Sequence, residues 1–144
     1  EDWIIQQAIM LLENRVFRGG PVLESPAAVR DYLRLKLVAE PNEILAVVFL
    51  NSQHQVLAFE PLFKGTVDQT PVYPRVLVQR ALALNAAALI LAHQHPSGKT
   101  EPSVADRAIT ERLTSALATI DVRVLDHFIV GKGSPYSFAE AGLL

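Results

Sequence analysis

Short apolar runs that alternate with segments of helical periodicity are the feature that most constrains the fold of this chain. The run at 43–50, EILAVVFL, is nearly continuous and rich in residues that favour strands, and the run at 86–92 predicts a buried strand. Neither run approaches the ~20 residues that a membrane-spanning helix needs. The alternation of helix-like and strand-like segments predicts an α/β or α+β domain.

Periodicity and turn residues place the expected elements along the chain. Ser25 followed by Pro26 has the pattern of an N-cap and a first helical residue. A turn at 51–53 separates two apolar segments, which predicts a β-hairpin. We expect the apolar tail after Pro135 to pack back on the domain. The expected helices are 3–17, Ser25 to about Ala39, 75–85 and 103–119, and the expected strands are 43–50, 55–63, 86–92 and 122–130.

Composition limits the class of protein. The chain has 144 residues, of which 50% are hydrophobic, which suits one domain with a core and argues against disorder. It has no cysteine, so any metal must be held by His and carboxylates rather than thiolates. A net charge of −2 gives no general attraction to nucleic acid. The acidic start lacks the basic region of a signal peptide, so a cytoplasmic location without membrane association is the expectation.

Two histidines follow the second apolar run. His93 and His95 stand at positions i and i+2, which point to the same face if the strand reaches them. Two imidazoles on one face can bind one zinc ion at ~2.0–2.1 Å. The loop that follows contains Pro96 and Gly98, which permit a tight turn, and the next helix would bring Asp106 under the histidines. Two histidines, one carboxylate and a water are typical of a catalytic zinc site.

The start of that helix has a second interpretation. Ser103 and Asp106 stand three residues apart and match a capping box. From the local pattern alone, helix cap and metal ligand remain in competition for Asp106. For Ser103 the two roles are compatible, because its backbone can start the helix while its hydroxyl faces the site.

The two remaining histidines give weaker signals. His54 lies in the hairpin turn and is expected to be solvated. His127 stands at the start of an apolar strand. It is either a buried, hydrogen-bonded structural residue or a residue that supports the metal site.

The run HQHPSGKTEPSVAD resembles the signature of the JAB1/MPN/Mov34 metalloenzyme superfamily, the JAMM motif, which reads H-x-H, seven residues, S, two residues, D. His93, His95, Ser103 and Asp106 match its spacing. Other segments are similar to RadC-like JAB domain proteins in particular, and the similarity covers about 41–144. These segments are NAAALILAHQHPSG, FKGT at 63–66, LDHFIVG at 125–131 and the terminal SFAEAGLL.

The resemblance implies a single JAB/MPN-type domain with a mixed central sheet flanked by helices. It also implies a zinc-dependent hydrolase that cleaves peptide or isopeptide bonds with a metal-activated water. The implied zinc ligands are His93, His95 and Asp106, and the hydroxyl of Ser103 would donate to the developing oxyanion. Glu43 stands where the superfamily has an upstream glutamate. Taken alone it is a solvated acid at a strand end, whereas the resemblance implies a general base that deprotonates water.

The resemblance also bears on domain organisation and partners. Residues 1–40 are expected to form an N-terminal helical segment that packs on the core, and 41–144 the JAB/MPN domain. RadC proteins usually carry a helix-hairpin-helix segment that is not recognisable here, so we interpret the chain as a short RadC-like protein or a trimmed domain. A peptide or protein substrate is the expected partner, and a homodimer is left open. The alternative is a DNA-repair module that binds or acts on nucleic acid, although no basic stretch with interleaved aromatic residues supports it.

Overall fold

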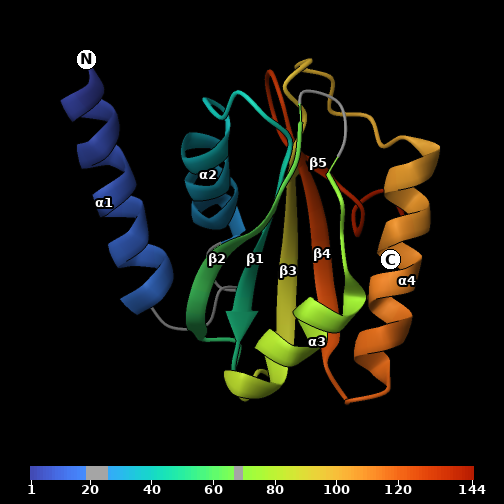
Figure 1. Cartoon of the computed structure of the whole chain (residues 1–144). Coiled ribbons are helices and arrows are strands. Elements are labelled where there is room, and N and C mark those ends of the chain that lie inside the picture. The colour runs from blue at the N-terminus through green and yellow to red at the C-terminus, as the bar shows by residue number, and fades with distance from the viewer. Residues whose placement is uncertain (19–25, 67–69) are drawn as a thin grey trace.

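The computed structural model describes residues 1–18, 26–66 and 70–144. Within these ranges the chain forms four helices and five strands (Figure 1). In chain order they are α1 (Asp2–Arg18), α2 (Pro26–Leu37), β1 (Ile44–Leu50), β2 (Val56–Lys64), α3 (Pro74–Ala83), β3 (Ala88–Gln94), α4 (Val104–Ala118), β4 (Arg123–Val130) and β5 (Tyr136–Ser137). The predicted Ser25 N-cap lies outside the described residues.

The strands form one mixed sheet in the order β2-β1-β3-β4-β5. β1 is antiparallel to both β2 and β3, β3 is parallel to β4, and the short β5 closes the far edge antiparallel to β4. The predicted hairpin, the mixed sheet and the returning tail are therefore confirmed. This is an α+β single domain, consistent with a JAB/MPN fold.

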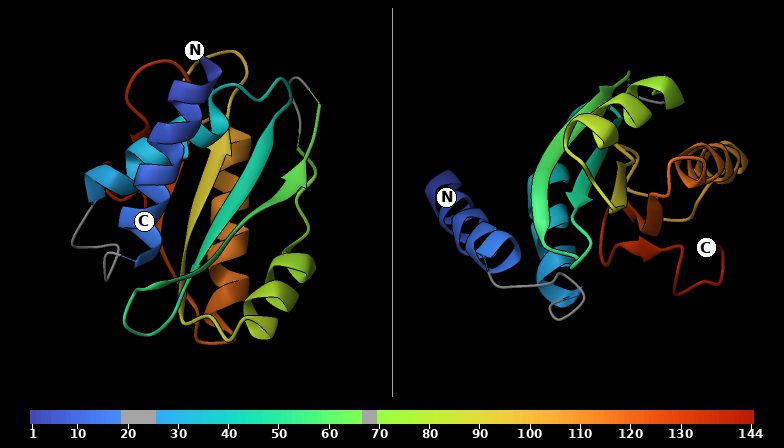
Figure 2. Two further views of the ribbon diagram at one scale, coloured as in Figure 1. Left: turned by 90° about the vertical axis from the view of Figure 1, so that its left-hand side faces the viewer. Right: turned by 90° about the horizontal axis from the view of Figure 1, so that it is seen from below.

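Helices cover both faces of the sheet (Figure 2). Side chains alternate between the faces of a strand, and β1 and β3 are buried on both sides. The even-numbered residues of β1 pack in one cluster with α1 and α2, and the odd-numbered residues pack in another with α3 and α4. This double cover explains why EILAVVFL shows no polar alternation.

The strand expected at 86–92 runs instead over Ala88–Gln94, because the turn after α3 is longer than predicted. Asn85 adopts a left-handed conformation with φ 53°. Ala86 still donates its backbone N–H to the carbonyl of Ala81 and so belongs to the end of α3. At the other end, β3 continues through His93 because this residue pairs with both neighbouring strands.

α1 is amphipathic and packs along α2. Its residues Ile9 and Val16 are buried in the cluster shared with the sheet, whereas Trp3, Met10 and Leu11 are exposed. No helix in the described parts of the chain is both long enough and apolar enough to cross a bilayer.

The loop at 96–102, here called the histidine loop, is fixed against the turn that follows β4. The carbonyl of Gly98 accepts a hydrogen bond of 2.8 Å from the backbone N–H of Lys132. Gly98 has a φ of 87°, which favours glycine. A Cβ atom on Gly131 would lie 2.5 Å from the oxygen of Gly98. Glycine at 131 therefore allows the two backbones to approach.

We expect Gly131→Ala to destabilise the protein by about 1–3 kcal/mol, the usual cost of overpacking, because the added methyl meets backbone atoms that cannot rotate away. Equilibrium urea unfolding measures the change. Lys132→Ala is the control: it keeps the N–H that bonds Gly98, so its stability is expected to stay within about 0.5 kcal/mol of wild type. An alanine variant at 131 with wild-type stability would contradict this close approach.

Candidate metal centre

Four ionisable side chains meet at the end of the sheet where β1 begins and β3 ends. The antiparallel register pairs Ile44 with Gln94. Glu43, just before β1, and His95, just after β3, therefore lie side by side. Because β3 extends to Gln94, His93 and His95 point to the same face. This face is covered by α4, whose first turn brings in Asp106.

Short contacts join these groups into one cluster. His93 lies between the two carboxylates: its Nε2 is 3.4 Å from Glu43 Oε2, and its Nδ1 is 3.1 Å from Asp106 Oδ1. The other oxygen of Asp106 is 3.1 Å from Nε2 of His95. Asp106 is 4% exposed, His93 7% and Glu43 9%. The cluster is largely removed from water, so each charge depends on the others.

The carboxylates and imidazoles shift one another's pKa in opposite directions. Burial alone would lower the pKa of His93, but Asp106 and Glu43 outweigh it and raise that pKa to about 9. Asp106 likewise raises the pKa of His95. Burial alone would raise the pKa of both acids. At Glu43 the interaction with His93 outweighs burial and lowers the pKa. At Asp106 the two imidazoles and the Ser103 N–H outweigh burial and lower the pKa. The carboxylates thus favour the protonated form of each imidazole, and the imidazoles favour the ionised form of each acid.

Ser103 and Asp106 form the predicted capping box. The hydroxyl of Ser103 accepts the backbone N–H of Asp106 at 3.0 Å, and Asp106 Oδ2 accepts the backbone N–H of Ser103 at 2.7 Å. The same carboxylate contacts both imidazoles. The two interpretations of Asp106 are thus compatible, because the cap holds the carboxylate at the histidines.

Glu43 is anchored at both its backbone and its side chain. Its N–H donates to the carbonyl of Thr66 at 2.6 Å, and its carbonyl accepts from the N–H of Gly65 at 2.8 Å. Thr70 donates its hydroxyl to Glu43 Oε2 at 2.9 Å. Glu43 is therefore a buried, partnered acid and differs from the solvated strand-end acid of the alternative interpretation. The threonine hydroxyl belongs to a loop whose sequence carries no signal of this role.

The histidine loop orients His95. Nδ1 of His95 lies 2.9 Å from the carbonyl of Lys99. A carbonyl only accepts, so Nδ1 carries the proton in the neutral ring and Nε2 presents its lone pair toward Asp106. A metal-ligating histidine is commonly fixed in this way through its second nitrogen. The pattern H-x-H does not reveal this carbonyl, which depends on how the loop folds.

His127 is fully buried beside the cluster, as expected for a structural histidine. Its Nδ1 lies 2.7 Å from the hydroxyl of Thr110, which donates to the carbonyl of Asp106 at 2.7 Å. The His127 ring stacks on Phe138 at 4.6 Å and on His93 at 6.1 Å. Burial lowers the pKa of His127 to about 3, so the ring is neutral. His127 therefore also supports the His93 ring from behind, through the stacking contact. His54 lies in the hairpin turn, as predicted, with a φ of 61°.

The donor set suits a metal ion. Donor atoms of Glu43, His93 and His95 lie within 4.8 Å of one another, a possible metal-binding group. Asp106 reaches each imidazole through a separate oxygen at 3.1 Å, and Glu43 faces the second nitrogen of His93 at 3.4 Å. Both ring nitrogens of His93 are buried and face carboxylate oxygens at 3.1 and 3.4 Å without hydrogen-bond geometry. An ion bound to one of these nitrogens would satisfy it.

The metal-binding group differs in one member from the predicted ligand set. It contains Glu43, whereas the motif implies Asp106. Asp106 contacts both imidazoles with separate oxygens, and Glu43 contacts one at a longer distance. The described geometry thus brings all four groups together and leaves two carboxylates as alternatives for the third ligand.

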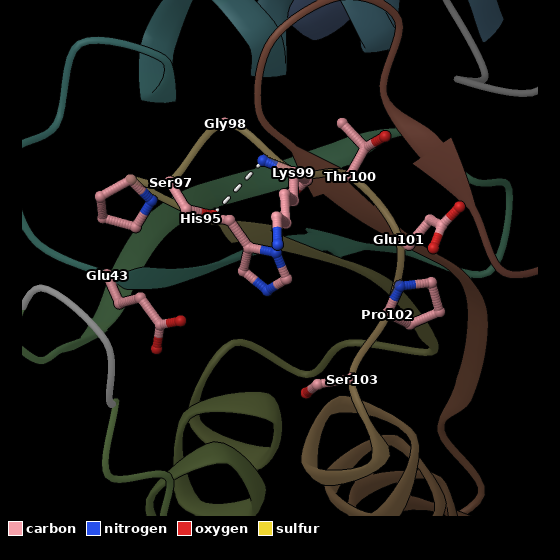
Figure 3. Close-up of a pocket in the computed structure, with 10 residues that line it drawn as sticks. Glu43, His95, Ser97, Gly98, Lys99, Thr100, Glu101, Pro102 and Ser103 are labelled. Atoms are coloured by element: carbon pink, nitrogen blue, oxygen red, sulfur yellow. Dashed lines mark hydrogen bonds between the residues drawn. The ribbon is translucent and has the colours of Figure 1, made fainter.

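Two hollows adjoin the cluster and share Glu43 and Ser103. The first, of about 750 Å³, is lined by the histidine loop and has seven polar or charged residues among its ten. Figure 3 shows Glu43, His95 and Ser103 around it, each from a different part of the chain. The second, of about 560 Å³, lies between α4 and residues 70–72. The cluster is therefore open to molecules from outside on two sides.

Comparison with known proteins agrees with the resemblance seen in the sequence. A UPF0758 protein of Methylibium petroleiphilum is 64% identical over 124 residues, which cover 86% of this chain and 56% of that protein. A UPF0758 protein of Leptothrix cholodnii is 64% identical over 142 residues, which cover 96% of this chain and 64% of that protein. A UPF0758 protein of Azotobacter vinelandii is 62% identical over 142 residues, which cover 96% of this chain and 63% of that protein. This chain thus spans 56–64% of the length of these relatives.

A family model adds the assignment of the domain itself. The RadC-like JAB domain matches residues 23–143, which include all four members of the cluster and Ser103. The chain belongs to the RadC-like JAB domain family.

Proposed function

We propose that this domain is a zinc-dependent hydrolase of the JAMM type that cleaves peptide or isopeptide bonds. The observation that carries the proposal is the buried cluster in which two imidazoles face two carboxylates at 3.1–3.4 Å, next to an open hollow. Two nitrogens and one carboxylate, with one position left for water, are typical of catalytic rather than structural zinc.

His93, His95 and Asp106 are the proposed ligands. Asp106 is favoured over Glu43 as the third ligand because it contacts both imidazoles and is fixed by the capping box. When bound, zinc lowers the pKa of a water ligand to about 7 and polarises a carbonyl oxygen. An amide bond is the substrate that needs both effects.

Glu43 is the proposed general base. It lines both hollows, and the Thr70 hydroxyl holds its Oε2 while Oε1 has no hydrogen bond to the described residues. The carboxylate accepts a proton from the attacking water and returns it to the leaving nitrogen. In the cluster without metal, His93 and the Thr70 hydroxyl already hold the pKa of Glu43 below its ordinary value, so the group is a carboxylate there.

Ser103 is the proposed donor to the oxyanion. Its oxygen accepts the N–H of Asp106, which leaves the hydroxyl proton free for another acceptor. Ser103 also lines both hollows, across from Glu43. A donor in such a position contributes about 10²–10³ to the rate of acyl transfer.

The first prediction concerns the metal. The wild-type protein is expected to bind one equivalent of zinc, and His95→Ala should weaken binding by more than about 100-fold, because loss of a partner behind a ligand alone costs 10–100-fold. Elemental analysis and competition with a chromogenic chelator measure both values. His54→Ala, in the hairpin turn, is the matched control and should bind as wild type. Equal zinc in the His95 and His54 variants would sink the ligand assignment.

The second prediction separates the two carboxylates. Glu43→Gln should retain zinc but lower hydrolysis by about 10²–10⁴, the usual contribution of a general base. Asp106→Asn should lose zinc. Zinc content and cleavage of a fluorescence-quenched peptide library by the same preparations provide the comparison. Loss of zinc from the Glu43 variant alone would exchange the roles of the two acids, and undiminished cleavage would remove Glu43 from the reaction.

A further inference from the structure

The second hollow, here called the α4 hollow, differs in chemistry from the polar hollow of the histidine loop. Its floor is Leu45, which is 1% exposed. Pro71 and Val72 line one side, and Ala105 and Ile109 line the other. At the cluster end it shares Glu43 and Ser103 with the polar hollow. Two hollows thus adjoin the reactive cluster, one lined mostly by polar residues and one with apolar residues on both walls.

Two features fix the walls of the α4 hollow. The hydrogen bond from Thr70 to Glu43 holds the 70–72 side against the cluster. The other wall is one side of α4, because Asp106, Ile109 and Arg112 follow one another at intervals of three residues. The hollow therefore begins at a reactive residue and extends along the helix.

A cation lies at the far end of this wall. Arg112 lines the α4 hollow, is exposed, and forms no ion pair with any residue that the structure describes. The carboxylates at the near end, Glu43 and Asp106, face imidazoles. Arg112 is therefore a cation of the hollow with no carboxylate partner among the described residues, and it lies about 9 Å along the helix from Asp106, since six residues rise 1.5 Å each.

We propose that the α4 hollow selects peptides that carry an aliphatic side chain beside the reacting bond and a carboxylate one to three residues further along. The apolar walls suit the side chain, and Arg112 suits the acid. An extended peptide advances ~3.3–3.6 Å per residue, which sets the distance between the two groups. The choice of a peptide as occupant rests on the proposed function. The carboxylate is either an acidic side chain or a chain terminus.

Binding of short peptides to the chelator-treated full chain tests this without turnover. The parent probe is acetyl-Leu-Gly-Asp-amide, followed by methyl NMR of Val72 and Ile109. Replacing Leu by Ser in the probe should weaken binding at least about tenfold, because an aliphatic side chain is no longer buried. Replacing Asp by Asn should weaken it about three- to fivefold, the range of an exposed ion pair. Acetyl-Leu-Gly with a free carboxylate distinguishes a chain terminus from an acidic side chain.

Two arginine variants of α4 provide the matched comparison. Arg112→Gln should remove the preference for Asp over Asn, whereas Arg107→Gln should keep it, because Arg107 is exposed on the same helix but does not line this hollow. No shift at Val72 and Ile109, equal binding of the Leu and Ser probes, or an unchanged acid preference in the Arg112 variant would overturn the proposal. Zinc binding or hydrolysis without these preferences would refute the subsite and leave the proposed function intact. If the peptide preferences are observed but neither zinc binding nor hydrolysis is, the subsite stands and the proposed function is refuted.

Discussion

The pairing of two carboxylates with two imidazoles organises one end of this domain. Two carboxylates and two imidazoles lie largely out of water, where an unpaired charge costs several kcal/mol. They come from three places: Glu43 precedes β1, His93 and His95 stand at the end of β3, and Asp106 lies in the first turn of α4. The cluster thus requires the β1–β3 register, the turn of the histidine loop and the start of α4 at the same time. Replacing one of these four side chains by an uncharged one leaves a neighbouring charged group without its partner.

In the proposed function, the ion-pair cluster and the metal site are two states of the same side chains. The acids raise the pKa of both histidines. A bound metal ion would require neutral imidazoles, and its charge would then balance the carboxylates in place of protons. The capping box and the Lys99 carbonyl hold Asp106 and His95 in either state. The chain's own hydrogen bonds therefore fix the positions of Asp106 and His95 in the cluster.

The sequence predicted those parts of the site that depend on local geometry. Positions i and i+2 on a strand place His93 and His95 on one face, and the spacing of Ser103 and Asp106 predicts a helix cap. Family resemblance added Glu43, whose local pattern alone suggests a solvated acid. The hydroxyl of Thr70 could not be foreseen, because it depends on how a loop packs on a distant strand end. The same holds for the α4 hollow, whose walls at 70–72 and at Ile109 are separated by over thirty residues in the chain.

Whether the cluster holds zinc in the proposed way is the central claim, and X-ray absorption at the zinc K edge of the loaded protein tests it most directly. The account predicts about four nitrogen and oxygen ligands at ~2.0–2.1 Å, with the outer-shell scattering of two imidazoles. That imidazole scattering should fall to one ring in His95→Ala with zinc forced in by excess metal. A shell of oxygen ligands without imidazole, or a spectrum unchanged by loss of His95, would contradict it.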